Sequence, residues 1–98
     1  MNAMKHHRYR ITVEHLADKD GAPVQEVPIV FEAPSHDDIA QTVQRAQQGQ
    51  ELDEATAQRM VVGLKLLGEV ILENRGNAFF DALGTHFRDI MKAVKGKA

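Results

Sequence analysis

Apolar and polar residues alternate in two segments near the N-terminus. In the first, Tyr9, Ile11 and Val13 share one face, and charged or polar side chains take the positions between them. The second alternation has the apolar positions Val27, Ile29, Phe31 and Ala33. A period of two is typical of a half-buried β-strand. Asp18 to Gly21, between the segments, is typical turn chemistry, so the pattern predicts a β-hairpin.

A three-residue loop at Lys19 to Gly21 predicts the register of this hairpin. It sets three apolar pairs opposite each other, namely Val13 with Val27, Ile11 with Ile29, and Tyr9 with Phe31. Pro28 interrupts the ladder, because proline has no backbone N–H to donate. A bulge or a slipped register is the alternative.

Three helical segments follow. Ser35 is the expected N-cap of the first, which runs to about Gln48, ends at Gly49 and has a thin apolar face. Asp53 is expected to cap a second helix that remains compatible with the sequence to Arg75. Gly76 then ends this helix, and Asn77 caps the third. Gly84-Thr85 is a candidate break within the third helix.

The second helix is apolar around most of its circumference, which predicts that it is the central, buried helix. Leu67 is expected in the core. The polar arc of this helix is narrow and comprises Lys65, Glu69 and Glu73. This arrangement favours a solvent-facing Glu69 over a desolvated acid–base residue. Gly63 and Gly68 are expected to mark points of close packing.

Together these elements predict a single α+β domain over residues 5–95, with a two-stranded antiparallel hairpin followed by three helices (ββααα). The apolar face of the hairpin is expected to pack on the second and third helices, and the first helix to be peripheral. Dimerisation would extend the sheet. Whether Met1 or Met4 is the native start is left open, and residues 1–3 are kept out of the predicted fold.

Composition adds few constraints. The 98 residues are 43% hydrophobic and 27% charged, as in ordinary globular domains, and there is no cysteine. Without cysteine there are no disulfides or thiolate metal sites, and a reducing compartment is compatible. The basic start has no apolar run behind it, and no apolar stretch is long enough to span a bilayer, so a cytoplasmic protein without membrane association is expected.

Motifs for chemistry are missing from the sequence. The histidines, including the His6-His7 pair, form no metal-binding spacing, and no serine or threonine lies in a nucleophile motif. Gly63 and Gly68 lie within a helix and do not form a phosphate loop. Nucleic-acid binding is disfavoured because the middle of the chain is acidic and the aromatic residues belong to apolar stripes. We therefore predict no catalytic, cofactor or metal site and lean against an enzyme.

Three segments resemble a known family. They are His7 to Glu14, Gly63 to Val70, and Phe79-Phe80 with Phe87 and Met91. Together they are similar to a family of short, uncharacterised bacterial proteins described as a domain of unknown function, and the similarity covers nearly the whole chain. This resemblance implies a bacterial cytosolic protein, and it implies no activity, substrate or catalytic residue.

Two functions remain open from the residues. The first is a small protein-interaction or regulatory module with an unidentified protein partner. The alternative is a small-molecule-binding protein or enzyme with a pocket near Glu69, His15 and Arg10.

A homodimer is the most specific expectation. Two strands alone are marginal and leave open edges, and Pro28 makes the first strand the better edge for pairing. A two-fold axis at Thr12 would place Arg10 of each chain opposite Glu14 of the other. Val62 and Leu66 on the second helix form the alternative interface, and a monomer whose edge is covered by a loop or by the first helix is the competing interpretation.

Overall fold

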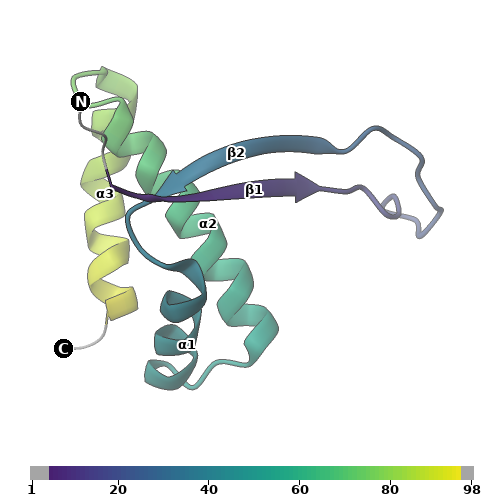
Figure 1. The fold of residues 1–98 in the computed structure, drawn as a ribbon, viewed down its shortest axis with the longest axis horizontal. Coiled ribbons are helices and arrows are strands. Elements are labelled where there is room, and N and C mark those ends of the chain that lie inside the picture. Colours follow the sequence, from purple (N-terminus) through teal and green to yellow (C-terminus); the bar gives the residue numbers. More distant parts are fainter. Residues whose placement is uncertain (1–4, 96–98) are drawn as a thin grey trace.

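The fold is a hairpin followed by three helices. A computed structural model describes residues 5–95 and gives strands β1 (His7–Val13) and β2 (Ile29–Ser35), then helices α1 (Ile39–Gly49), α2 (Glu54–Glu73) and α3 (Ala78–Lys95) (Figure 1). β1 and β2 pair antiparallel in a two-stranded sheet. The predicted ββααα order is confirmed.

The register of the hairpin changes along its length. In the ladder Val13 pairs with Ile29, so the predicted pairing of Val13 with Val27 is wrong by two residues. Closer to the turn, the bridge between Ala17 and Pro23 keeps the predicted register. Two extra residues are thus accommodated in the segment that contains Pro28, and β2 begins directly after it. Since the shift is two residues, each side chain keeps its predicted face.

Asp18 and Gly21 form the turn, as predicted. The Asp18 carboxylate accepts hydrogen bonds from the backbone N–H groups of Asp20 and Ala22, at 2.9 and 3.0 Å. Gly21 has a φ of +87°, a conformation that favours glycine. The hairpin therefore closes through an aspartate turn of the expected kind.

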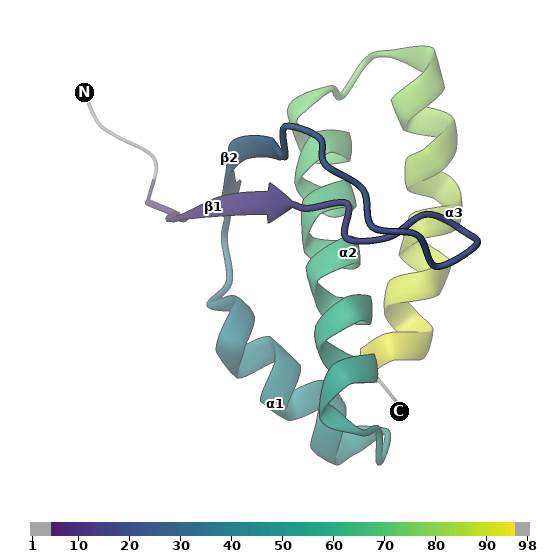
Figure 2. The same ribbon diagram turned by 90° about the vertical axis from the view of Figure 1, so that its right-hand side faces the viewer.

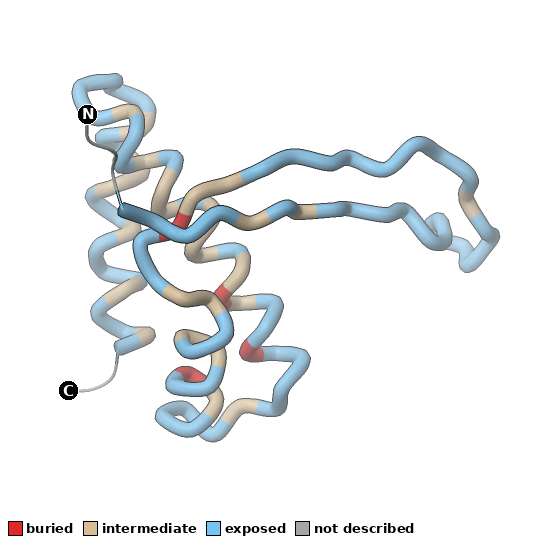
Figure 3. Tube along the Cα trace, viewed as in Figure 1, coloured by how far each residue is buried: buried red, intermediate tan, exposed pale blue. Residues whose placement is uncertain are grey.

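The hairpin projects away from the helices (Figure 1). We call residues 10–32 the arm. Its apolar residues Val13, Ile29 and Phe31 are 50%, 63% and 40% exposed, whereas Ser35 at the base is buried (Figure 3). The prediction that the apolar face packs on the second and third helices is therefore wrong. β2 leads into α1 through a short turn, so the hairpin meets α2 near this end. In Figure 2 the arm points towards the viewer and crosses in front of α2 and α3.

Helix α1 starts later than predicted. Asp38, and not Ser35, is the N-cap, and its carboxylate accepts a hydrogen bond from the Gln41 N–H at 3.2 Å. Ser35 ends β2, where its hydroxyl donates to the Asp37 carbonyl oxygen and accepts from the Asp37 N–H. Both residues are good caps, and this local turn engages the serine first. The predicted end at Gly49 agrees with the structure.

The best-buried apolar contact lies between α1 and α2. Among the described residues, the buried apolar side chains are Ala46 of α1 and Ala57 and Val61 of α2 (Figure 3). The prediction that the first helix is peripheral is therefore wrong. Alanines bury little area, but they let two helix backbones approach closely, which an analysis of large apolar residues overlooks.

Helices α2 and α3 follow the predicted boundaries closely. Asp53 is the N-cap residue of α2, although its side chain makes no capping hydrogen bond. Gly76 has a φ of +92°, and the Asn77 side chain accepts hydrogen bonds from Phe79 and Phe80 N–H at the start of α3. The expected break at Gly84-Thr85 is wrong, because α3 is continuous through it.

The two glycines of α2 have different surroundings. A Cβ atom on Gly68 would lie 3.1 Å from the Phe87 ring, so its predicted role in close packing is confirmed. A Cβ atom on Gly63 would meet nothing within 4 Å, so that prediction is wrong. Leu67 is 41% exposed in the single chain, so the prediction that it lies in the core is wrong. Helix α2 thus leaves part of its apolar surface uncovered.

Substitution of Ala57 tests the α1–α2 contact. Ala57→Leu should lower the free energy of unfolding by about 1–3 kcal/mol, because the larger side chain has no room between the helices. Ala55→Leu, on the exposed side of the same helix, is the matched control and should change it by less than about 0.5 kcal/mol. Urea denaturation at one fixed protein concentration measures both, and equal losses would contradict this core.

Candidate functional site

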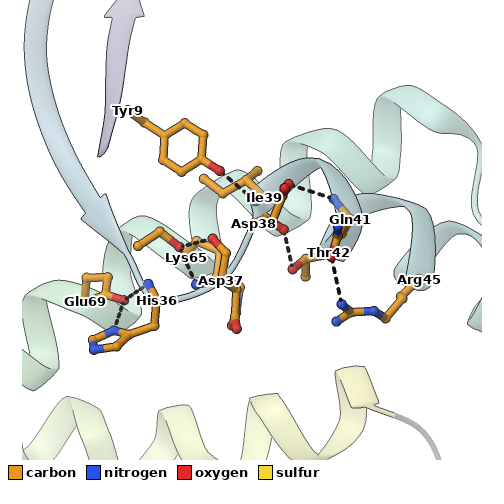
Figure 4. A network of polar contacts seen from close by, with 11 residues as sticks. Tyr9, His36, Asp37, Asp38, Ile39, Gln41, Thr42, Arg45, Lys65 and Glu69 are labelled. Carbon is orange, nitrogen blue, oxygen red and sulfur yellow. Dashed lines mark hydrogen bonds and ion pairs between the residues drawn. The ribbon is translucent and has the colours of Figure 1, made fainter. Parts of the chain in front are cut away.

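A short turn joins the hairpin, α1 and α2. This β2–α1 turn comprises residues 35–38, from the last residue of β2 to the N-cap of α1. The Tyr9 hydroxyl of β1 accepts a hydrogen bond from the Ile39 N–H at 2.9 Å, so β1 satisfies a free donor in the first turn of α1 (Figure 4). The base of the hairpin is thereby fixed to the helix that follows.

Two charged side chains of α2 hold this turn. Glu69 accepts from the His36 backbone N–H at 3.0 Å, and its carboxylate lies 2.8 Å from His36 Nδ1. Lys65, one helical turn earlier, forms an ion pair with Asp37 (Figure 4). The side chains of Glu69 and Lys65 are only 12% and 17% exposed. These pairs are therefore better shielded on the α2 side than ordinary surface ion pairs.

Each pair shifts the pKa of its exposed partner. The hydrogen bond to Glu69 and the charge of that carboxylate raise the pKa of His36. The hydrogen bond from Lys65 lowers the pKa of Asp37, although partial burial of the carboxylate acts in the opposite direction. Both shifts favour the charged forms and so strengthen the clamp between the turn and α2.

Beside this clamp runs a groove of about 700 Å³ between α2 and α3. We call it the α2–α3 groove. Its apolar lining comes from both helices, and its charged lining comes from the clamp, from the α2–α3 turn and from α3.

The structure does not assemble the predicted pocket. Glu69 lies in the α2–α3 groove, but Arg10 and His15 belong to the arm. Arg10 lies 3.8 Å from Glu32, and His15 lies 3.4 Å from Glu26. The pocket predicted near Glu69, His15 and Arg10 is therefore wrong, because the hairpin extends away from the helix that carries Glu69.

The environment of Glu69 differs from the one that the sequence predicts. The sequence favours a solvent-facing side chain, yet the Glu69 side chain is largely buried and holds His36 in place. One signal in the sequence pointed to this arrangement. Residues 36 and 37 form a basic–acidic pair, and Lys65 and Glu69 present complementary charges one turn apart on an otherwise apolar helix.

The predicted interface residues occupy two places. Arg10, Thr12 and Glu14 are exposed on β1 or directly after it, while Val62 and Leu66 are half-buried on α2. Their role in a dimer stays a prediction.

Within residues 5–95, no group of three or more histidine, aspartate or glutamate side chains is placed to hold a metal ion. None of the helices in this range combines the length and apolar character needed to cross a membrane.

The His36–Glu69 pair predicts a pH dependence of stability. Because folding raises the pKa of His36 above its unfolded value of about 6.5, the pair stabilises the fold fully below that pH. The contribution is lost as the pH rises through the folded pKa. In thermal melts between pH 5.5 and 8.5, His36→Gln should remove this component, whereas His86→Gln on α3 should retain it. An unchanged pH profile in His36→Gln would contradict the assignment.

Comparisons with known proteins identify the family. No curated protein matches the chain. A crystal structure of a protein of unknown function from Pectobacterium atrosepticum is similar, with 28% sequence identity and a TM-score of 0.77 over 95% of this chain and 100% of that one. The family model for a domain of unknown function with a solved structure, DUF3861, matches residues 7–96. The chain therefore belongs to the DUF3861 family, whose function is unknown.

Proposed function

We propose that this protein is a cytoplasmic interaction module that works as a homodimer, with the arm as its contact element. The observation that carries the proposal is the apolar face of the arm, which the helices of the same chain leave uncovered. Exposed clusters of large apolar side chains on a small domain are typical of protein contact sites. The absence of cysteine is compatible with the cytoplasm.

The two faces of the arm differ in chemistry. Tyr9 points towards α1, so the alternation along β1 places Ile11 and Val13 on the same face. On the opposite face Arg8 donates to Glu32 at 2.8 Å, and this hydrogen bond lowers the pKa of Glu32. The charged face is suited to water, and the apolar face requires a partner.

The exposed area supports a partner of substantial size. A folded monomer of 10.9 kDa should expose about 5,600 Å², whereas this chain exposes 7625 Å². The terminal residues outside the described range would add at most about 1,100 Å² even if fully exposed. An excess of at least about 900 Å² remains, close to the roughly 800 Å² that each partner buries in a standard interface.

A second copy of the chain fits the open edge of β1. With a two-fold axis at Thr12, Arg10 lies opposite the partner's Glu14, and the next pair sets Tyr9 opposite the partner's His15. The distal arm of each chain then runs alongside the base of the other arm, towards the helices. This arrangement supports contacts at both the strand edge and α2, where Val62 and Leu66 lie.

A charge-reversal pair tests the dimer. Sedimentation equilibrium at tens of micromolar should show a dimer for the wild type. Glu14→Arg should weaken it, because it sets two arginines opposite each other without touching the pairing of Glu32 within the chain. Adding Arg10→Glu to that variant should restore association across the two-fold axis.

Asp89→Arg, a similar charge reversal on α3, is the control and should leave the mass unchanged. A monomeric wild type would refute the homodimer. A dimer indifferent to Glu14→Arg would refute the β1 edge, and its loss in Leu66→Glu would assign the interface to α2.

A further inference from the structure

We propose that the α2–α3 groove binds a small amphipathic carboxylate, with its apolar body along the floor and its carboxylate between Arg75 and Arg88. This site is separate from the proposed dimer contact.

Seven charged or titratable side chains line the groove, of which four form ion pairs and three do not. Lys65 is paired with Asp37, and His36 with Glu69. The Asp81 carboxylate accepts a hydrogen bond from the Gly76 N–H at 3.2 Å, which closes the α2–α3 turn. Arg75 and Arg88 line the same groove and have no ion-pair partner among residues 5–95.

Guanidinium groups bind a carboxylate well, because their planar donors match its two oxygens. Arg75 lies in the turn that follows α2, and Arg88 lies in the middle of α3. An anion held by both would bridge the two helices, along a seam where α3 contributes no fully buried residue in the described range.

Apolar residues of both helices form the floor of the groove. Leu64, Leu72, Phe87 and Met91 supply its apolar surface. Gly84 adds no side chain, and a Cβ atom there would lie 3.2 Å from Ile71. The volume of about 700 Å³ is within the range of small-molecule sites, which are mostly apolar with a few polar groups that fix orientation.

The groups without an ion-pair partner, Arg75, Arg88 and Asp81, carry a net charge of +1, which favours a ligand with a single negative charge. The Asp81 carboxylate in the same groove would repel a ligand with several negative charges, such as a polyphosphate. A monocarboxylate with an aliphatic or aromatic body matches both the charge and the floor.

Decanoate is a suitable probe, with decan-1-ol as the uncharged control for its apolar chain. Isothermal titration should show that decanoate binds the wild type, and that decan-1-ol binds more weakly. Arg75→Ala and Arg88→Ala should each weaken decanoate binding about tenfold or more, because a charge-assisted hydrogen bond is lost. Arg59→Ala, an exposed arginine of α2 outside the groove, is the matched control and should leave the affinity unchanged.

Circular dichroism and sedimentation equilibrium on the same variants separate this proposal from the dimer. Both groove variants should keep the helical spectrum and the mass of the wild type, since their side chains are exposed. Failure of decanoate to bind, equal affinity for decan-1-ol, or binding unchanged by both groove substitutions would overturn the groove proposal and leave the dimer proposal standing.

Discussion

The clamp between the β2–α1 turn and α2 sets the arrangement of the whole chain. At this one place Tyr9 reaches α1, Ser35 is buried, and Glu69 and Lys65 hold the turn from the side of α2 (Figure 4). Solvent-exposed ion pairs contribute little to stability, but a mostly buried charge that loses its partner is costly. The polar junction therefore specifies the direction of the hairpin in a chain whose fully buried apolar contact between α1 and α2 is small.

The direction of the hairpin explains the exposed apolar surface. Because the chain passes from β2 into α1 within a few residues, the base of the hairpin packs and the arm does not. A two-stranded ribbon is marginal in water, and this one also presents Ile29 and Phe31 to solvent. Coverage of the arm by a second copy would remove an open edge and an apolar face together, which is why the two features support one proposal.

The elements were predictable because they depend on local patterns. Alternation gives the strands, Asp18 and Gly21 give the turn, and Gly76 with Asn77 gives the boundary between the long helices. Pro28 correctly indicated where the register of the hairpin changes, but it did not indicate a shift of two residues. The predicted packing failed where it depended on distant partners. Ala46 and Ala57 look unimportant by hydrophobicity, and no local rule joins His36 to a glutamate 33 residues away.

The surroundings of α2 show why a helix with an apolar sequence is not fully buried in this fold. At 100° per residue, Leu66 and Val70 lie nearly opposite Gly68 and Leu72, which line the groove. Val61 is buried, Gly68 approaches Phe87 of α3, and Val70 remains exposed. A helix that is apolar nearly all round normally lies inside a core, yet here one chain covers only part of it. The apolar residues left over on α2 and on the arm are thus two parts of one observation: this sequence encodes more apolar surface than a single copy of the fold can bury.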